Sequence, residues 1–109
     1  MNSVFKIVHA AEWAAVRDAY DGSAKDRADG FLHFSTAAQI PSTLARHYAD
    51  ARDLVLVAVD EAALGAALKH EPSRDGALFP HLYGPLPLSA VSWVKPIGRS
   101  KDGGFVIPL

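Results

Sequence analysis

The sequence predicts an α+β domain, because strand and helix patterns alternate at first and are then followed mainly by strands. The side chains of residues 4–9 alternate between two largely apolar faces, as they do in a strand. Residues 12–20 carry large apolar side chains at helical spacing. Residues 54–59 are a continuous apolar run, which is typical of a central strand covered on both faces. With 109 residues, the chain is expected to form one domain over residues 1–109.

The other elements follow from turn residues, caps and shorter patterns. In the first half of the chain, we expect a polar loop over residues 21–30, a strand over 31–35 and a helix over about 39–49. After the central strand, we expect a helical turn over 60–64 that is capped by Asp60, and a stretch over 67–71 that fits either a helix or a strand and is assigned to a strand. A strand over 90–96 and an edge strand over 105–107 complete the expected elements. Thr36 and Gln39 have capping-box spacing. Pro41 places the helix start near Gln39 or a kink at that point.

Composition excludes several classes of protein. The net charge is −1 with both signs interspersed, which disfavours a nucleic-acid partner. No apolar run is long enough to span a bilayer, and no signal peptide pattern is visible. Because the chain has no cysteine, disulfides and thiolate metal sites are excluded, and we expect a cytoplasmic protein.

The segment Gly30-Phe31-Leu32-His33-Phe34-Ser35 carries the first candidate site residues. Side chains on a strand alternate, so Phe31, His33 and Ser35 share one face. An imidazole beside a hydroxyl on one face of a buried strand is compatible with chemistry. It is equally compatible with a core histidine that is hydrogen-bonded to a carbonyl.

Residues 79–87 carry the second set. Their prolines and a glycine surround His81-Leu82-Tyr83, so the segment is expected to be rigid and to lie outside the middle of any sheet. His81 and Tyr83 lie on one side of an extended path. If His9, His33 and His81 converge, they could form a catalytic cleft or a zinc site, but no local two-histidine motif supports zinc, and no metal is expected.

Several blocks of the sequence resemble one known family. Lys-Ile-Val-His, Gly-Phe-Leu-His-Phe-Ser-Thr, Asp-Leu-Val-Leu-Val-Ala-Val-Asp, His-Glu-Pro-Ser and Phe-Pro-His-Leu-Tyr-Gly-Pro-Leu occur in this order over roughly residues 4–97. They resemble the bacterial domain-of-unknown-function family 952. The resemblance implies an ADP-ribosyltransferase-like fold, a small split β-sandwich of two short mixed or antiparallel sheets with two or three short helices and a NAD cleft between the sheets.

The likeness to transferases implies roles for individual residues. Such enzymes carry a His near the end of the first strand, which matches His9, and an aromatic residue in a Gly-led strand, at or next to which His33 stands. A catalytic Glu normally opens a later strand. Here that neighbourhood reads His81-Leu82-Tyr83 without an acid, and the nearest carboxylate is Glu71 on another expected strand. The related RNA 2′-phosphotransferases use His and Arg instead, so NAD use stays open.

Three interpretations remain. In the first, the domain is an enzyme that uses NAD or an ADP-ribose-like nucleotide as substrate, with His9, His33 and His81 as catalytic residues and Ser35, Thr36, Glu71, Arg74 and Tyr83 as ligand-binding residues. In the second, it is a ligand-binding or regulatory module without chemistry. In the third, the histidines are packing residues. No firmly bound cofactor is expected, and the oligomeric state is left open.

Overall fold

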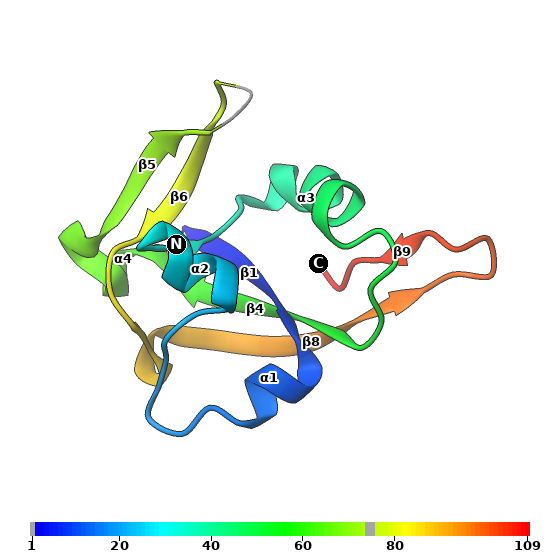
Figure 1. Cartoon of the computed structure of the whole chain (residues 1–109), viewed down its shortest axis with the longest axis horizontal. Coiled ribbons are helices and arrows are strands. Elements are labelled where there is room, and N and C mark those ends of the chain that lie inside the picture. The colour runs from blue at the N-terminus through cyan, green and yellow to red at the C-terminus, as the bar shows by residue number, and fades with distance from the viewer. Residues whose placement is uncertain (1, 74–75) are drawn as a thin grey trace.

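The largest sheet has four antiparallel strands in the order β1-β4-β8-β9 (Figure 1). The computed structural model describes residues 2–73 and 76–109. The strands of this sheet are β1 (Ser3–His9), β4 (Leu54–Asp60), β8 (Val91–Arg99) and β9 (Phe105–Val106). β4 lies between two neighbours and is buried along nearly its whole length, so the predicted central strand is confirmed.

Two smaller antiparallel sheets complete the strands. One has the order β3-β6-β5, and the other pairs β2 with β7. Their bounds are β2 (Ala19–Tyr20), β3 (Leu32–His33), β5 (Leu68–Pro72), β6 (Leu78–Leu82) and β7 (Leu86–Pro87). The α+β prediction is confirmed, with three small antiparallel sheets in place of the expected two.

The helices are short. They are α1 (Ala10–Ala14), α2 (Ala24–Asp29), α3 (Ile40–His47) and α4 (Glu61–Leu64), with 3₁₀ turns η1 (Ala37–Gln39), η2 (Gly65–Ala67) and η3 (Leu88–Ala90). The expected cap of α4 is present, since the side chain of Asp60 accepts a hydrogen bond from Ala62 N at 3.1 Å. None of the helices in the described ranges is long and apolar enough to cross a membrane.

Two apolar clusters explain how the layers pack, because β1 is covered on both faces. Val4 and Val8 belong to a cluster with Leu32 and Leu82 of the three-stranded sheet and with Phe34, the residue that follows β3. The opposite face of the four-stranded sheet packs against α3. The residues of that second cluster include Phe5, Ile7, Ile40, Leu44 and Leu56.

The N-terminal half differs from the prediction. The expected helix over 12–20 is divided into the short α1 and the strand β2, and the expected loop over 21–30 contains α2. α2 has no apolar stripe and is defined by its ends. Ser23 and Asp26 form a reciprocal capping box, and Gly30 ends the helix in the left-handed region at φ 85°.

The segment with prolines also differs from the prediction, because β6 is the central strand of its sheet. Pro80 is tolerated there because its carbonyl accepts from Phe34 N at 2.9 Å, one residue beyond β3. The backbone nitrogen of Pro80, which has no hydrogen to donate, faces the same side of β6 as its carbonyl. Because β3 ends at His33, no further ladder hydrogen bond is required on that side. The expected strand over 31–35 is accordingly limited to residues 32–33, and Ser35 instead forms an isolated bridge with Phe5 of β1.

Candidate functional site

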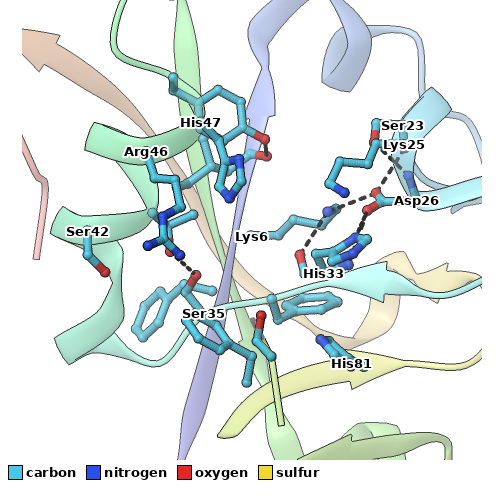
Figure 2. Close-up of a pocket in the computed structure, with 17 residues that line it drawn as sticks. Lys6, Ser23, Lys25, Asp26, His33, Ser35, Ser42, Arg46, His47 and His81 are labelled. Carbon is cyan, nitrogen blue, oxygen red and sulfur yellow. Dashed lines mark hydrogen bonds and ion pairs between the residues drawn. The ribbon is translucent and has the colours of Figure 1, made fainter. Parts of the chain in front are cut away.

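A cavity of about 210 Å³ lies between α2, α3, the middle of β1 and one face of the three-stranded sheet (Figure 2). Hydroxyl groups and aromatic rings form part of its wall. The cationic and imidazole side chains that line it are Lys6, Lys25, Arg46, His33, His47 and His81. Figure 2 shows Arg46 and His47 on one side of the cavity, and Asp26 and His33 on the other.

Asp26 is fixed by the start of α2. Its Oδ2 accepts from Ser23 N at 2.9 Å, while Ser23 Oγ accepts from Asp26 N at 3.1 Å. The preceding Gly22 has φ +101°, and a Cβ at this position would lie 2.8 Å from the Asp26 Cβ. The tight approach of the chain before α2 therefore requires glycine.

A buried ion pair joins α2 to β1. Lys6 Nζ lies 2.9 Å from Asp26 Oδ2, with side chains that are 5% and 2% exposed, and donates to the carbonyl of His33 at 2.8 Å. Burial lowers the pKa of the Lys6 ammonium, and the adjacent Asp26 opposes that shift. Burial would also raise the pKa of Asp26, but the hydrogen bond from His33 and the charge of Lys6 hold that pKa well below its usual range.

His33 is bound by two carboxylates. Its Nδ1 lies 2.6 Å from Asp26 Oδ1, and its Nε2 lies 3.0 Å from Asp29 Oδ2. Its backbone N also donates to Asp26 Oδ1 at 3.2 Å. A carboxylate therefore lies at each ring nitrogen of His33, with a hydrogen bond at Nδ1 and an ion-pair contact at Nε2.

A second histidine–carboxylate pair lies across the sheet. His81 Nδ1 is 2.9 Å from Glu71 Oε1, and Tyr83 Oη donates to the same oxygen at 2.7 Å. The antiparallel pairing of β5 with β6 brings Glu71 to these side chains. The hydrogen bonds from Tyr83 and His81 lower the pKa of Glu71, and the same contact raises the pKa of Tyr83.

The two histidines are direct cross-strand partners on β3 and β6. Their ring centroids are 5.6 Å apart, with an angle of 71° between the ring planes. Phe31 packs on both, with its ring centroid 4.7 Å from His33 and 4.2 Å from His81, and it also lies 5.3 Å from the ring of Tyr83. One face of the three-stranded sheet therefore presents two imidazoles and an aromatic cluster.

The structure brings three of the sequence-predicted residues to the cavity wall: His33, His81 and Ser35. Ser35 is placed by its backbone bridge to Phe5, and its Oγ lies 3.0 Å from Thr43 Oγ1 of α3. The structure thus places these three side chains around one space.

The other predicted residues lie elsewhere. Glu71 and Tyr83 reach the cavity through His81 and do not line it themselves. Thr36 caps η1, where its backbone N donates to Gln39 Oε1 at 2.9 Å. His9 is exposed at the end of β1, with its ring 6.0 Å from that of Tyr48. Arg74 lies outside the described residues.

Sequence reasoning missed Lys6, Lys25, Asp26, Arg46 and His47 as lining residues. Two signals were available for the buried pair. Lys6 interrupts an otherwise apolar face between Val4 and Val8, and a lysine buried there requires an anionic partner. Ser23 and Asp26 have the spacing of a helix cap. Among the described residues, no three His, Asp or Glu side chains are arranged to hold a metal ion.

Comparisons with known proteins agree on one relationship. The chain is similar to protein CC0527 from Caulobacter crescentus. Its crystal structure matches with a TM-score of 0.89 at 42% identity, covering 95% of this chain and 93% of that chain. The solution NMR structure of the same protein gives a TM-score of 0.84 at 42% identity, covering 95% of this chain and 91% of that chain. A search of curated proteins found no match. A family model matches residues 7–94, and the chain therefore belongs to the family described as protein of unknown function DUF952.

Proposed function

We propose that the protein binds a nucleotide-like anion of the NAD or ADP-ribose kind in the cavity. The observation that carries this proposal is the combination of cationic, imidazole and aromatic side chains around one cavity. Phosphate groups are recognised by such cations and hydrogen-bond donors, and ring systems pack on aromatic faces. The resemblance to the ADP-ribosyltransferase-like fold, with its NAD cleft between two sheets, supports the same ligand class.

The charge of the wall favours an anion. Lys6 and Asp26 neutralise each other in the described part of the wall, to which Lys25 and Arg46 add cationic side chains. Lys25 is well exposed, and its side chain reaches Asp29 at 3.1 Å, a surface pair of small energy that a phosphate can replace.

The size of the cavity limits how much of the ligand is enclosed. At about 210 Å³, it is smaller than the roughly 300–1,000 Å³ typical of sites that enclose a drug-sized molecule. A phosphoribosyl part would lie inside, and the base would extend toward Phe31 and Tyr83. Tyr83 is 42% exposed, so its ring is available for stacking, which contributes about 1–3 kcal/mol per base in proteins that bind single-stranded nucleic acids.

Calorimetry with ADP-ribose, NAD, AMP and adenosine tests this proposal. We expect the three phosphate-containing ligands to bind and adenosine to bind at least tenfold more weakly. Lys25→Gln should weaken AMP binding, whereas Lys101→Gln, which removes an exposed lysine in the turn between β8 and β9, should not. Equal binding of adenosine and AMP, or no heat with any of them at millimolar concentration, would contradict the proposal.

A module that binds this ligand without chemistry is the second candidate. The observation that favours it is the engagement of both ring nitrogens of His33 by Asp26 and Asp29. A group held in this way cannot exchange a proton with a ligand until one contact opens. Saturable binding without any change in the ligand after prolonged incubation would identify such a module.

A further inference from the structure

We propose that the cavity is a hydrolytic site for a phosphodiester of a ribose hydroxyl, in which His81 acts as general base and His33 as general acid. This inference rests on the proposed binding of a nucleotide in the same cavity. It goes beyond binding because it assigns a reaction and distinct roles to the two histidines. Its basis is that both imidazoles line one cavity, are cross-strand partners and differ in how carboxylates engage them.

His81 has the geometry of a base. It is 6% exposed, and its Nδ1 is engaged by Glu71, whose carboxylate is also held by Tyr83. A carboxylate at Nδ1 selects the tautomer with the proton on that nitrogen, so the lone pair lies on Nε2. Within the described part of the chain, Nε2 of His81 makes no hydrogen bond that competes with a water molecule. Glu71 is therefore a positioning residue for His81.

His33 has the geometry of an acid. Asp26 is hydrogen-bonded to Nδ1, and Asp29 lies 3.0 Å from Nε2, so a carboxylate faces the nitrogen that would carry the transferred proton, which becomes available once a ligand oxygen displaces Asp29. Asp26 is 2% exposed and fixed by the cap of α2, so it positions the ring. Asp29 is 39% exposed at the end of α2, so an oxygen of a ligand can take its place.

The reaction balances with water as the second substrate. The water oxygen forms a bond to phosphorus while its proton passes to Nε2 of His81. The bond from phosphorus to the ribose oxygen breaks, and that oxygen takes the proton from Nε2 of His33. The products are a phosphomonoester and a free ribose hydroxyl, and solvent then returns a proton to His33 and removes one from His81.

The wall also suits the charge of this reaction. Phosphoryl transfer depends mainly on positioning and on cations near the equatorial oxygens. Lys25 and Arg46 lie on opposite sides of the cavity, on α2 and α3, where they can neutralise those oxygens. A ribose alkoxide is a poor leaving group, so a reaction that expels it benefits from both an acid and a base. The phosphoribosyl part of a cyclic nucleotide, which contains the reacting bond, is also the part that the limited volume of the cavity would hold.

Two substrates separate the roles of the histidines. 2′,3′-Cyclic AMP expels a ribose hydroxyl and needs the acid, whereas bis(4-nitrophenyl) phosphate expels a stable nitrophenolate and does not. We would measure kcat and KM for both in buffer with EDTA, which suppresses contaminating metal-dependent enzymes. The variants are His81→Gln and His33→Gln. The control is His70→Gln, an exposed histidine on β5 that is paired with Glu61.

General acid–base groups typically contribute about 10²–10⁴-fold to a rate. We therefore expect His81→Gln to lower kcat by about a hundredfold or more on both substrates. His33→Gln should lower kcat by a similar factor on 2′,3′-cyclic AMP alone. The activity that this variant retains on bis(4-nitrophenyl) phosphate would show that it is folded. His70→Gln should match the unaltered protein.

Several outcomes would overturn the inference. Turnover that survives His81→Gln would show that His81 is not the general base. Equal losses of kcat on both substrates in folded His33→Gln would show that His33 is not the general acid. Binding of AMP by calorimetry without hydrolysis of either substrate would refute catalysis while leaving the proposed function intact. Absence of both binding and turnover would refute both proposals.

Discussion

The buried pair of Lys6 and Asp26 gives the sharpest test of what holds α2 against β1. Lys6→Met keeps most of the volume of the side chain and removes its charge. Asp26, at 2% exposure, then keeps its hydrogen bonds from Ser23 and His33 but loses the ammonium 2.9 Å away. Removing one member of a buried pair typically costs about 3–5 kcal/mol, because an uncompensated charge remains.

That cost is a large part of the stability of a small domain, which is usually about 5–15 kcal/mol. At about 4 °C per kcal/mol for a chain of this size, Lys6→Met should lower Tm by roughly 12–20 °C. The matched control is Lys101→Met, an exposed lysine for which we expect a change within about 0.5 kcal/mol.

Urea unfolding of Lys6→Met, Asp26→Asn and the double variant measures the coupling directly. Since Asp26→Asn removes the charge that Lys6→Met leaves unpaired, the double variant should lose less than the sum of the single losses, by about 1–3 kcal/mol. A loss below about 1 kcal/mol in Lys6→Met, or strictly additive losses, would refute the reasoning. The junction between α2 and β1 would then depend on apolar packing.

Three further predictions concern neighbouring residues. His33→Ala should cost about 2 kcal/mol or more in urea unfolding because Asp26 loses a partner, whereas His33→Gln should retain part of that stability. The pKa of Asp26 is held below its usual value, so its contribution to stability is complete above about pH 4 and is lost as the pH falls further; the urea midpoint should decline there, and less so in Asp26→Asn. The protein should not release nicotinamide from NAD at enzymatic rates, because the oxocarbenium-like transition state needs a free carboxylate at the ribose. Asp26 lines the cavity but is already paired with Lys6 and His33, and Glu71, already bound to His81 and Tyr83, does not line it. Release that is abolished by Glu71→Gln would show the opposite.

The sequence was most informative where burial alone decides the structure. β4 could be predicted because an uninterrupted apolar run has few alternatives to a strand covered on both faces. α2 could not be predicted in this way, since its buried side chain is the carboxylate of Asp26. The helical form of α2 depends on its two caps and on Lys6 of β1. The spacing of apolar residues along the sequence does not indicate caps or ion-pair partners. β6 was missed because the effect of Pro80 depends on where the neighbouring strand ends.

The candidate site was predicted in part for the same reasons. Strand alternation placed His33 with Ser35 on one face, and the structure brings both to the cavity. The carboxylates at the histidines could not be assigned, because contact between Glu71 and His81 depends on the register of β5 against β6. The prediction for His9 depended on its place at the end of a strand and on the resemblance to transferases, and His9 is not among the residues that line the cavity.

The position of Asp26 links the stability of the domain to its candidate site. One oxygen of this carboxylate pairs with Lys6, and the other holds His33, so the same side chain joins two elements and orients a ring at the cavity. Buried ion pairs are frequently no more stabilising than apolar residues of similar volume. A version of the domain with an apolar pair in place of Lys6 and Asp26 could therefore fold as well as this one, yet its His33 would lose the hydrogen bond at Nδ1 that orients the ring. Stability alone does not explain why a lysine and an aspartate occupy this part of the core, and the role proposed for His33 at the cavity would account for both residues.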